Sequence, residues 1–481
     1  MVKNEVLIGR SEEINILERY CESPKSEFVA VYGRRRVGKT FLVRETLGDV
    51  FDFEFSGLYE TPATVQREEF QKEINRRSKE TSKTPVNWFD AFDNLKEYLV
   101  SLKKERVVVF IDELPWMDTP KSNFRTALAS FWNGWGNRKP ILKLYVCGSA
   151  TTWMVDKLIG DKGGLYGRIT RPIYLAPFSL SETEQYLNNI KKMGYSKKQI
   201  LDVYMVFGGI PYYLDMFDRS IPLTVNIDNL LFADNAPLRN EYDFLFRSLF
   251  QDSVNYRKVI ELLSKKLVGL TREEISKGSG LSGGELSKIL SNLSSCDFIR
   301  GYMAPKKKER NQMYQLTDMF SLFYLRFVKT APRANENYWT NLMNSGKKNS
   351  WTGYAFEQVC LHHIKQIKKK LGISGIASNV YAWSQKAYTD ADGNEWNGGQ
   401  IDLIIDRSDD VMNLCEMKYS NEEYSIDKKY EKTIRERNSM FRHSEKTKKG
   451  LRCTFITTYG VKDNMHKEIV DNEILLEDLF E

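Results

Sequence analysis

Residues 33–40 form a glycine-framed loop whose residue types suit phosphate binding. They read Gly-Arg-Arg-Arg-Val-Gly-Lys-Thr, with an apolar run at 28–32 before them and a helix-like segment after them. In such a strand–loop–helix unit, backbone N–H groups and the positive end of the helix dipole point at phosphate oxygens. Lys39 would reach the outer phosphates and Thr40 would hold Mg²⁺. The pattern predicts a site for ATP, and a plain glycine turn is the alternative. The residues expected to contact the nucleotide here are Gly33, Arg34, Arg35, Arg36, Val37, Gly38, Lys39, Thr40 and Phe41.

Two adjacent acids follow a second apolar run at 107–111. In phosphate-loop enzymes the first such acid, here Asp112, lies near the Mg²⁺ ion. The second, here Glu113, orients or deprotonates the attacking water. Asp-Glu at the end of a strand is common, but about 70 residues after a phosphate loop it favours hydrolysis over binding alone.

Ser149 and Arg168 are two further candidates for the same site. Ser149 follows the apolar run at 142–147, where a small polar side chain can touch the terminal phosphate or the attacking water. The alternative is an ordinary turn serine. Arg168 is a candidate arginine finger, acting within the chain or on a neighbouring subunit, and the second case would require a homo-oligomer. An ordinary surface arginine is the competing interpretation.

A second chemical centre is predicted near the C-terminus. Strand-like residues 400–406 turn at 407–410 into 411–418, which predicts a hairpin with Asp402 opposite Glu416 and with Lys418 on the face of Glu416. Glu357, from a predicted helix at 351–370, would join them. These carboxylates are suitable ligands for Mg²⁺ or Mn²⁺, and Lys418 would orient water or neutralise charge. A solvent-facing, salt-bridged patch is the alternative.

The chain is too long for one ordinary core, and we expect several domains. Strands alternating with helices predict a parallel α/β sheet for residues 1–177, followed by a helical lid at 178–245. Residues 331–350 are polar and predict a linker. An α/β domain is expected at 351–481.

Residues 246–330 predict a winged helix. Two amphipathic helices within 270–293 are separated by a glycine-rich turn at 278–284, and two strands at 298–302 and 313–316 follow. Between these strands lies the basic segment 306–310, which would lie along a DNA backbone. Winged helices also serve as protein-contact modules, so this second interpretation stays open.

Composition sets the broad class. The formal net charge of +7, with a pI near 8.8, permits contact with nucleic acid. Six widely spaced cysteines argue against both a disulfide framework and a zinc ribbon. The sequence has neither a membrane-length apolar run nor a signal-peptide core at its start, so we expect a cytoplasmic protein that does not contact membranes.

The N-terminal motifs resemble the prokaryotic AAA+-type ATPases of the signal-transducing, STAND-like branch. They are Ile8-Gly9-Arg10-Ser11-Glu12-Glu13, the phosphate loop, Phe110-Ile111-Asp112-Glu113, Cys147-Gly148-Ser149 and Phe207-Gly208-Gly209-Ile210-Pro211. The resemblance covers most of the first 330 residues, winged helix included. It implies that Gly9 and Arg10 lie near the adenine, that Ser149 senses the terminal phosphate, and that Pro211 lines the lid side of the nucleotide.

The last ~130 residues resemble the PD-(D/E)XK nuclease superfamily. Ile401-Asp402 would be the aspartate motif, and Glu416-Met417-Lys418 the (D/E)XK element. The chain departs from the pattern at Gln400-Ile401, where proline usually precedes the aspartate. Together the two resemblances imply an ATPase whose nucleotide state controls a metal-dependent nuclease-like domain, with DNA as the favoured substrate. The alternative is an ATP-switched regulatory or DNA-binding protein whose nuclease fold is catalytically silent.

Overall fold

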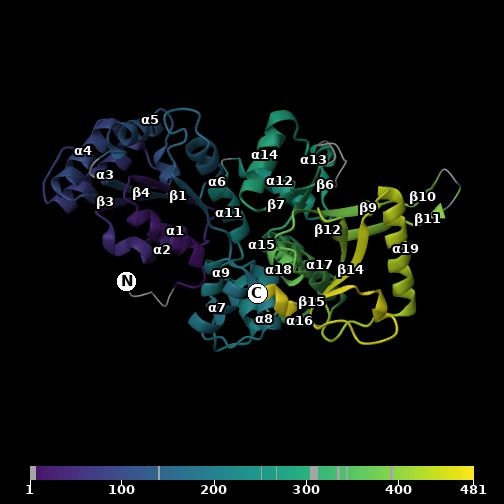
Figure 1. The fold of residues 1–481 in the computed structure, drawn as a ribbon. Helices are drawn as coiled ribbons and strands as arrows, with labels where there is room; N and C mark the ends of the chain where they lie inside the picture. The colour runs from purple at the N-terminus through teal and green to yellow at the C-terminus, as the bar shows by residue number, and fades with distance from the viewer. Residues whose placement is uncertain are drawn as a thin grey trace. The chain divides into compact units, whose positions relative to one another are not determined.

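The protein is described by a computed structural model covering residues 7–138, 141–250, 252–266, 268–303, 312–332, 336–342, 345–390, 393 and 395–481. The chain divides into two compact units, Met1–Pro177 and Phe178–Glu481 (Figure 1). Each unit contains its own sheets and its own buried apolar core.

The first unit is built on a five-stranded parallel sheet in the order β2–β3–β4–β1–β5. Its strands are β1 (Glu27–Tyr32), β2 (Phe53–Ser56), β3 (Arg106–Asp112), β4 (Ile141–Gly148) and β5 (Arg171–Tyr174). The predicted parallel α/β sheet is confirmed. Strand β2 begins only at Phe53, because Gly48–Val50 form a 3-10 turn ahead of it. Since all five strands run the same way, their carboxyl ends meet at one edge, with β4 between β1 and β3.

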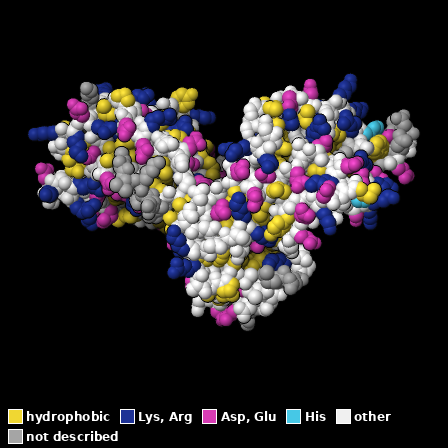
Figure 2. Space-filling view, turned by 60° about the horizontal axis from the view of Figure 1, so that its bottom comes forward, with side chains coloured by type: hydrophobic (Ala, Val, Ile, Leu, Met, Phe, Trp, Pro, Cys, Tyr) yellow, Lys and Arg dark blue, Asp and Glu magenta, His cyan; other side chains and the backbone are white. Residues whose placement is uncertain are grey.

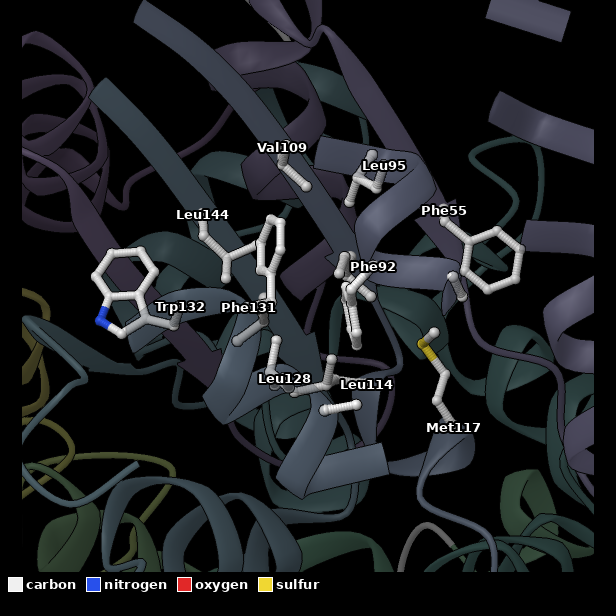
Figure 3. Packing of buried hydrophobic residues seen from close by; sticks show 14 of the residues in the cluster. Phe55, Phe92, Leu95, Val109, Leu114, Met117, Leu128, Phe131, Trp132 and Leu144 are labelled. Carbon is white, nitrogen blue, oxygen red and sulfur yellow. The ribbon is translucent and has the colours of Figure 1, made fainter. Parts of the chain in front are cut away.

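Helices surround this sheet (Figure 1). They are α1 (Ser11–Glu22), α2 (Lys39–Leu47), α3 (Ala63–Ser78), α4 (Trp88–Ser101), α5 (Phe124–Phe131) and α6 (Thr151–Trp153). An aromatic cluster joins α3, α4 and α5 to the sheet, and Figure 3 shows part of it. Within it Phe92 stacks on Phe131 with ring centroids 5.2 Å apart. This packing holds β3, and therefore the two acids at its end, against the helical layer.

The second unit begins with helices in the range predicted as a lid. They are α7 (Leu180–Gln185), α8 (Lys197–Phe207), α9 (Pro211–Asp215), α10 (Leu223–Leu231) and α11 (Glu241–Leu249). Ser179 and Ser196 each start a helix with a capping box, in which side chain and backbone exchange hydrogen bonds. Gly208, with φ of 66°, ends α8 in the left-handed conformation that favours glycine.

A small helical and antiparallel module follows. Its elements are α12 (Ser253–Leu263), β6 (Leu270–Thr271), α13 (Arg272–Ser279), α14 (Gly283–Ser295), β7 (Ile299–Tyr302) and β8 (Met313–Leu316), with strand order β6–β8–β7. The helix pair and the strand pair expected from the sequence are both present. The basic segment 306–310 lies outside the described residues.

The C-terminal sheet has the order β15–β14–β13–β12–β9. Its strands are β9 (Ser378–Gln385), β12 (Gly399–Arg407), β13 (Val411–Lys418), β14 (Gly450–Thr457) and β15 (Asn472–Leu475), and β10 (Tyr388–Thr389) pairs with β11 (Glu395–Trp396). β12 and β13 form the predicted hairpin. Helix α19 (Lys428–Glu445) packs Met440 and Phe441 against this sheet (Figure 1).

The segment between these modules is more ordered than a linker. It contains α15 (Met319–Phe323), α16 (Tyr338–Asn341), α17 (Gly346–His362) and α18 (Ile364–Lys370). The helix predicted at 351–370 is therefore two helices, and the first begins inside the predicted linker because Ser345 accepts a hydrogen bond from the Lys348 N–H. Trp339 and Trp351 are buried against Phe327, which ties this segment into the core. Within the described residues, we find no helix with the length and apolar character to cross a bilayer.

The aromatic cluster generates a stability prediction. Phe92 is 2% exposed, whereas Phe89 on the same helix is 38% exposed. Phe92→Ala should destabilise the first unit by about 3–5 kcal/mol, because it leaves a cavity among fixed rings. Phe89→Ala should change stability by about 0.5 kcal/mol or less. Urea unfolding of the two variants checks this, and equal midpoints would contradict the packing described.

Candidate nucleotide site and candidate carboxylate site

The loop between β1 and α2 has a backbone that requires glycine at both ends. Gly33 has φ of 147°, and a Cβ atom there would lie 2.3 Å from the carbonyl oxygen of Leu175. Gly38 has φ of 88° and precedes the first residue of α2. Side chains at these positions would force the loop away from β5 or strain the turn into the helix. The loop shape thus depends on the two glycines that frame it.

Lys39 and Thr40 lie at the start of α2 and connect the loop to its surroundings. Lys39 Nζ donates to the carbonyl oxygens of Gly33 at 3.1 Å and Arg34 at 3.0 Å. Thr40 Oγ1 donates to the carboxylate of Asp112, with oxygen–oxygen distances of 3.0 and 2.9 Å. This hydrogen bond joins the loop directly to the end of β3. Thr40 and Asp112 are the two residues that the sequence predicts to hold the Mg²⁺ ion together.

Asp112 and Glu113 have different environments. Burial, with help from the negative charge of Glu113, raises the pKa of Asp112 above its ordinary value. Glu113 lies just beyond the strand with φ of 44°, a conformation uncommon for a residue with a side chain. Its Oε2 accepts hydrogen bonds from the Ser149 N–H at 3.0 Å and the Ser149 hydroxyl at 2.9 Å.

The other residues predicted to contact the nucleotide lie before α1, before β5, at the start of α9 and in the loop itself. Gly9 and Arg10 have left-handed backbones before α1, and the Arg10 guanidinium donates to Ala176 O at 2.6 Å. Arg168 is exposed in the turn before β5, and Pro211 begins α9 in the second unit. In the loop itself, Arg34 and Val37 are buried and Arg35 and Arg36 half-buried, whereas Phe41 is 45% exposed.

These residues fit a bound nucleotide with Mg²⁺. The Thr40 hydroxyl and the Asp112 carboxylate, already in contact, supply the oxygen donors that Mg²⁺ prefers. When bound, the ion neutralises charge on the phosphate oxygens. Lys39 lies along the loop with its Nζ on the Gly33 and Arg34 carbonyl oxygens, where it would supply a cation to the outer phosphates, and the loop glycines leave room for close approach of phosphate.

The second candidate site lies where β12 and β13 pair. Leu403 pairs with Cys415, so that Asp402 and Glu416 are the next facing residues. Glu416 is buried, with Lys418 Nζ 3.3 Å from its Oε2. Tyr430 on α19 donates its hydroxyl to Oε2 at 2.5 Å, and Arg437 on the same helix forms an ion pair with Oε1. Both oxygens of Glu416 therefore have cationic or hydroxyl partners.

Electrostatics show that the four predicted residues influence one another. Burial, followed by the charge of Asp402, raises the pKa of Glu357 to about 8. Burial also raises the pKa of Asp402, to which Gln400 donates a hydrogen bond. For Glu416 burial favours the neutral acid, but Arg437 and then Lys418 outweigh it and lower its pKa. The cluster thus combines two acids whose pKa values are raised, Glu357 and Asp402, with Glu416, whose pKa is lowered.

The carboxylates of this site are not arranged as a metal-binding site. Among the residues that the structure describes, no three His, Cys, Asp or Glu side chains are grouped so that they could hold a metal ion. Glu357, Asp402 and Glu416 are close enough to shift one another's pKa values, yet Glu416 is turned to Arg437 and Tyr430. As placed, the three predicted ligands do not fit a bound Mg²⁺ or Mn²⁺.

Arg437 and Tyr430 contact Glu416 at this site, and Arg300 interacts with the site only electrostatically; the sequence predicted none of the three. Arg437 and Tyr430 lie in a highly charged helix, where one more arginine or tyrosine carries no distinguishing signal. Arg300 lies in β7, and the charge of Asp402 acts on it. No local pattern links residues so far apart in the chain, so only the tertiary structure could identify them.

Comparison with known proteins bears on the first site. Residues 7–217 match a family described as an ATPase domain predominantly from Archaea. An uncharacterised protein of Methanocaldococcus jannaschii is 23% identical over 371 residues, which span 76% of this chain and 78% of that protein. An uncharacterised ATP-binding protein of the same organism is 43% identical over 42 residues, which are 9% of this chain and 71% of that one.

Two solved structures have similar chains. A Walker-type ATPase of Pyrococcus abyssi has a TM-score of 0.47 and 19% identity, covering 68% of this chain and 97% of its own. The ORC2 protein of Aeropyrum pernix has a TM-score of 0.42 and 13% identity, covering 66% and 93%.

The family match and the loop geometry together define the class of the first site. The chain carries a P-loop ATPase domain within residues 7–217. The sequence prediction is confirmed at the level of this domain, and the placement of Lys39, Thr40 and Asp112 at the nucleotide stays a prediction.

The framing glycine generates a prediction for this site. Gly33→Ala should weaken ATP binding about tenfold or more, because backbone strain of this kind costs on the order of 1–3 kcal/mol. Gly48→Ala is the matched control at the far end of α2, where a Cβ atom would meet nothing within 4 Å. Titration with a fluorescent ATP analogue measures both, and unchanged affinity in Gly33→Ala would contradict the role given to the loop.

Proposed function

We propose that this protein binds and hydrolyses ATP and that its nucleotide state controls a metal-dependent nuclease-like domain acting on DNA. Residues 1–177 would be the ATPase core, 178–245 the lid, 246–330 a winged helix and 351–481 a PD-(D/E)XK nuclease-like domain. The observation that supports the nuclease part is that Lys418 Nζ lies 3.3 Å from Glu416 on β13. Asp402 faces Glu416 from β12, and α17, which carries Glu357, packs on β13.

In the ATPase part, Glu113 is the general base or water-positioning residue. It is held by Ser149, whose N–H and hydroxyl both donate to one carboxylate oxygen. Both hydrogen bonds end on the same oxygen of Glu113, so this oxygen is already engaged by the protein. Ser149 would have to break its hydrogen bonds to Glu113 before Glu113 could activate water. The Ser149 hydroxyl would then donate a hydrogen bond to the terminal phosphate. Arg168, exposed before β5, stays a candidate finger.

Contacts within the second unit support control of the C-terminal site by the lid. The Leu180 N–H at the start of α7 donates to His363 Nε2 at 3.1 Å, while His363 Nδ1 lies 2.7 Å from Val359 O. Burial lowers the pKa of His363 to about 4, so the ring stays neutral and keeps both bonds at physiological pH. His363 ends α17, the helix that carries Glu357. A movement of α7 would therefore displace the end of α17 through this hydrogen bond.

A second contact joins the lid to β13. Tyr419, which follows Lys418, hydrogen-bonds through its hydroxyl to Asp202 on α8 at 3.2 Å. Lys198 on the same helix bonds to this hydroxyl and lies over the ring, 4.4 Å from its centroid. Two lid helices thus hold the elements that carry Glu357, Glu416 and Lys418, and a lid that follows nucleotide state would move them.

The module of α12–β8 supports DNA as the substrate. The exposed face of α14 carries the small side chains Ser287 and Ser291 and the base Lys288 beside the acid Glu285, whereas Leu286 and Leu290 are buried. Such a face can approach a nucleic-acid backbone closely. Lysine and arginine side chains are interspersed with acids over the face shown in Figure 2, so binding would rest on local contacts more than on one basic surface.

A second candidate function is favoured by the state of Glu416. Its ion pair with Arg437 and the hydrogen bond that it accepts from Tyr430 leave both oxygens of this buried carboxylate paired. A protein in which this bridge is permanent would be an ATP-switched regulatory or DNA-binding protein with a catalytically silent nuclease fold.

The ATPase part predicts the effect of removing one carboxylate. Glu113→Gln should lower kcat for ATP hydrolysis by about 10²- to 10⁴-fold while ATP binding persists, because a general base is lost but the loop is intact. Glu105→Gln, an exposed residue just before β3, is the matched control. Phosphate release and nucleotide titration measure the two quantities. Undiminished turnover in Glu113→Gln would remove it from the mechanism.

The nuclease part of the proposal predicts that DNA cleavage can be lost without loss of ATP turnover. Asp402→Ala should abolish cleavage of linear, supercoiled or single-stranded DNA in Mg²⁺ or Mn²⁺ and leave ATP turnover intact, because the two sites use different residues. Asp463→Ala, an exposed acid of the same domain, should retain cleavage. Assays with and without ATP give the direction of control. Cleavage that survives Asp402→Ala would refute the assignment, and no cleavage under any condition would favour the regulatory candidate.

A further inference from the structure

A cavity of about 500 Å³ lies within the second unit, and none of its described lining residues belongs to either candidate site. The lining comes from the end of α12, from α15 and the helical turn that follows it, and from α17. The volume falls in the range of about 300–1,000 Å³ that is usual for small-molecule sites. The cavity therefore has the size of a ligand site and lies between the α12–β8 module and α17.

The floor of this cavity is apolar and aromatic. Leu322, Trp351 and Tyr354 line it and are buried. Trp351 is held by edge-on ring contacts with Phe323 and Phe327, in which the centroids lie 5.7 Å apart. A ligand with polar groups on every side would lose hydrogen bonds to water against such a floor without replacing them. The floor therefore favours a ligand with a flat apolar surface.

The rim of the cavity is basic. Lys265 follows α12, Arg326 lies in the π-helical turn Tyr324–Val328, and Lys329 follows that turn; all three are exposed. Within the described part of the chain, neither Lys265 nor Arg326 takes part in a salt bridge. Both side chains can therefore turn toward an anion in the cavity.

One acid also lines the cavity. Glu261 on α12 would repel an anion, but Lys329 Nζ lies 2.8 Å from its Oε1 and offsets its charge. The charged lining thus consists of three bases and one acid, which gives it a net formal charge of +2. The cavity is suited to a ligand with about two negative charges.

Charge and shape together indicate the class of ligand. A phosphate monoester carries a charge of about −1.5 to −2 at pH 7, which matches the net charge of the lining. Arginine and lysine bind phosphate through charge-assisted hydrogen bonds, and arginine can engage two oxygens at once. Ser350, also in the lining, carries a hydroxyl that can donate to the same group. A flat ring attached to this phosphate would lie on the apolar floor.

We propose that this cavity binds a nucleoside monophosphate unit, with the phosphate at Lys265 and Arg326 and the base on the floor of Leu322, Trp351 and Tyr354. The unit is a free nucleotide or one nucleotide of a single strand, since both present a phosphate beside a flat base. The site uses no residue of the phosphate loop and none of the carboxylates. It therefore goes beyond the proposed function and does not depend on it.

The test measures binding to the full-length chain, with no reaction required. Isothermal titration calorimetry follows dAMP, dCMP, dGMP and dTMP, with inorganic phosphate and ribose phosphate as comparators that lack a base. Fluorescence anisotropy follows a short, labelled oligo-dT strand. The two arms separate a free nucleotide from a nucleotide within a strand.

Substitutions of the rim should change affinity in opposite directions. Lys265→Gln and Arg326→Gln should each weaken binding about tenfold, because each removes a charged donor to the phosphate. Glu261→Gln should tighten binding by about a few fold, because it removes a negative charge from the lining. Lys266→Gln is the matched control, since Lys266 is exposed next to Lys265 but pairs with Glu274 at 2.7 Å. It should leave affinity unchanged, and circular dichroism establishes that each variant is folded.

The outcomes decide both the site and its ligand. Nucleotide binding that weakens in Arg326→Gln and persists in Lys266→Gln would support a free nucleotide, and the same pattern with oligo-dT alone would support a strand. Inorganic phosphate or ribose phosphate that binds as tightly as the nucleotides would overturn the place given to the base. No binding of any probe, or binding that is equal in Lys265→Gln, Arg326→Gln and the unaltered chain, would overturn the site. Neither of these last results bears on ATP turnover or on DNA cleavage, so failure here is distinct from failure of the proposed function.

Discussion

The parallel arrangement of β1, β4 and β3 is the constraint on which the nucleotide site depends. Because the three strands run in one direction, the loop after β1, Ser149 after β4, and the acids after β3 end at one edge of the sheet. The hydrogen bond between Thr40 and Asp112 then joins positions 72 residues apart. The buried aromatic layer over β3 keeps this edge in register. Displacement of β3 would separate the cation donors from the phosphate loop.

Both candidate sites hold a reactive carboxylate with hydrogen bonds from the protein itself. Glu113 is held by Ser149, and Glu416 by Arg437 and Tyr430. A carboxylate in a partly buried position needs such partners, since its charge is poorly solvated there. The same bonds occupy oxygens that would otherwise be open to a ligand. At each site a ligand of these oxygens would have to compete with a partner from the protein itself.

The second unit places the elements of the carboxylate site between two sets of neighbours. Lid helices α7 and α8 contact α17 and Tyr419, whereas β7 contacts β9 on the edge of the same sheet. A shift of the lid relative to the α12–β8 module would therefore act on the site from both sides. Packed interfaces of this kind have discrete arrangements more readily than intermediate ones, which suits the control by nucleotide state proposed above for the carboxylate site.

The sequence by itself determined the phosphate loop, the Asp-Glu pair, the parallel sheet and the β12–β13 hairpin, because these depend on short-range spacing, alternation and turn chemistry. It did not determine the early start of α17, which follows from the Ser345 cap and from aromatic packing around Phe327. Nor did it indicate the contact of Arg437 with Glu416. Only the tertiary structure decided these, because charges distant in sequence are brought together by packing, and a local pattern carries no record of which arginine a buried carboxylate will meet.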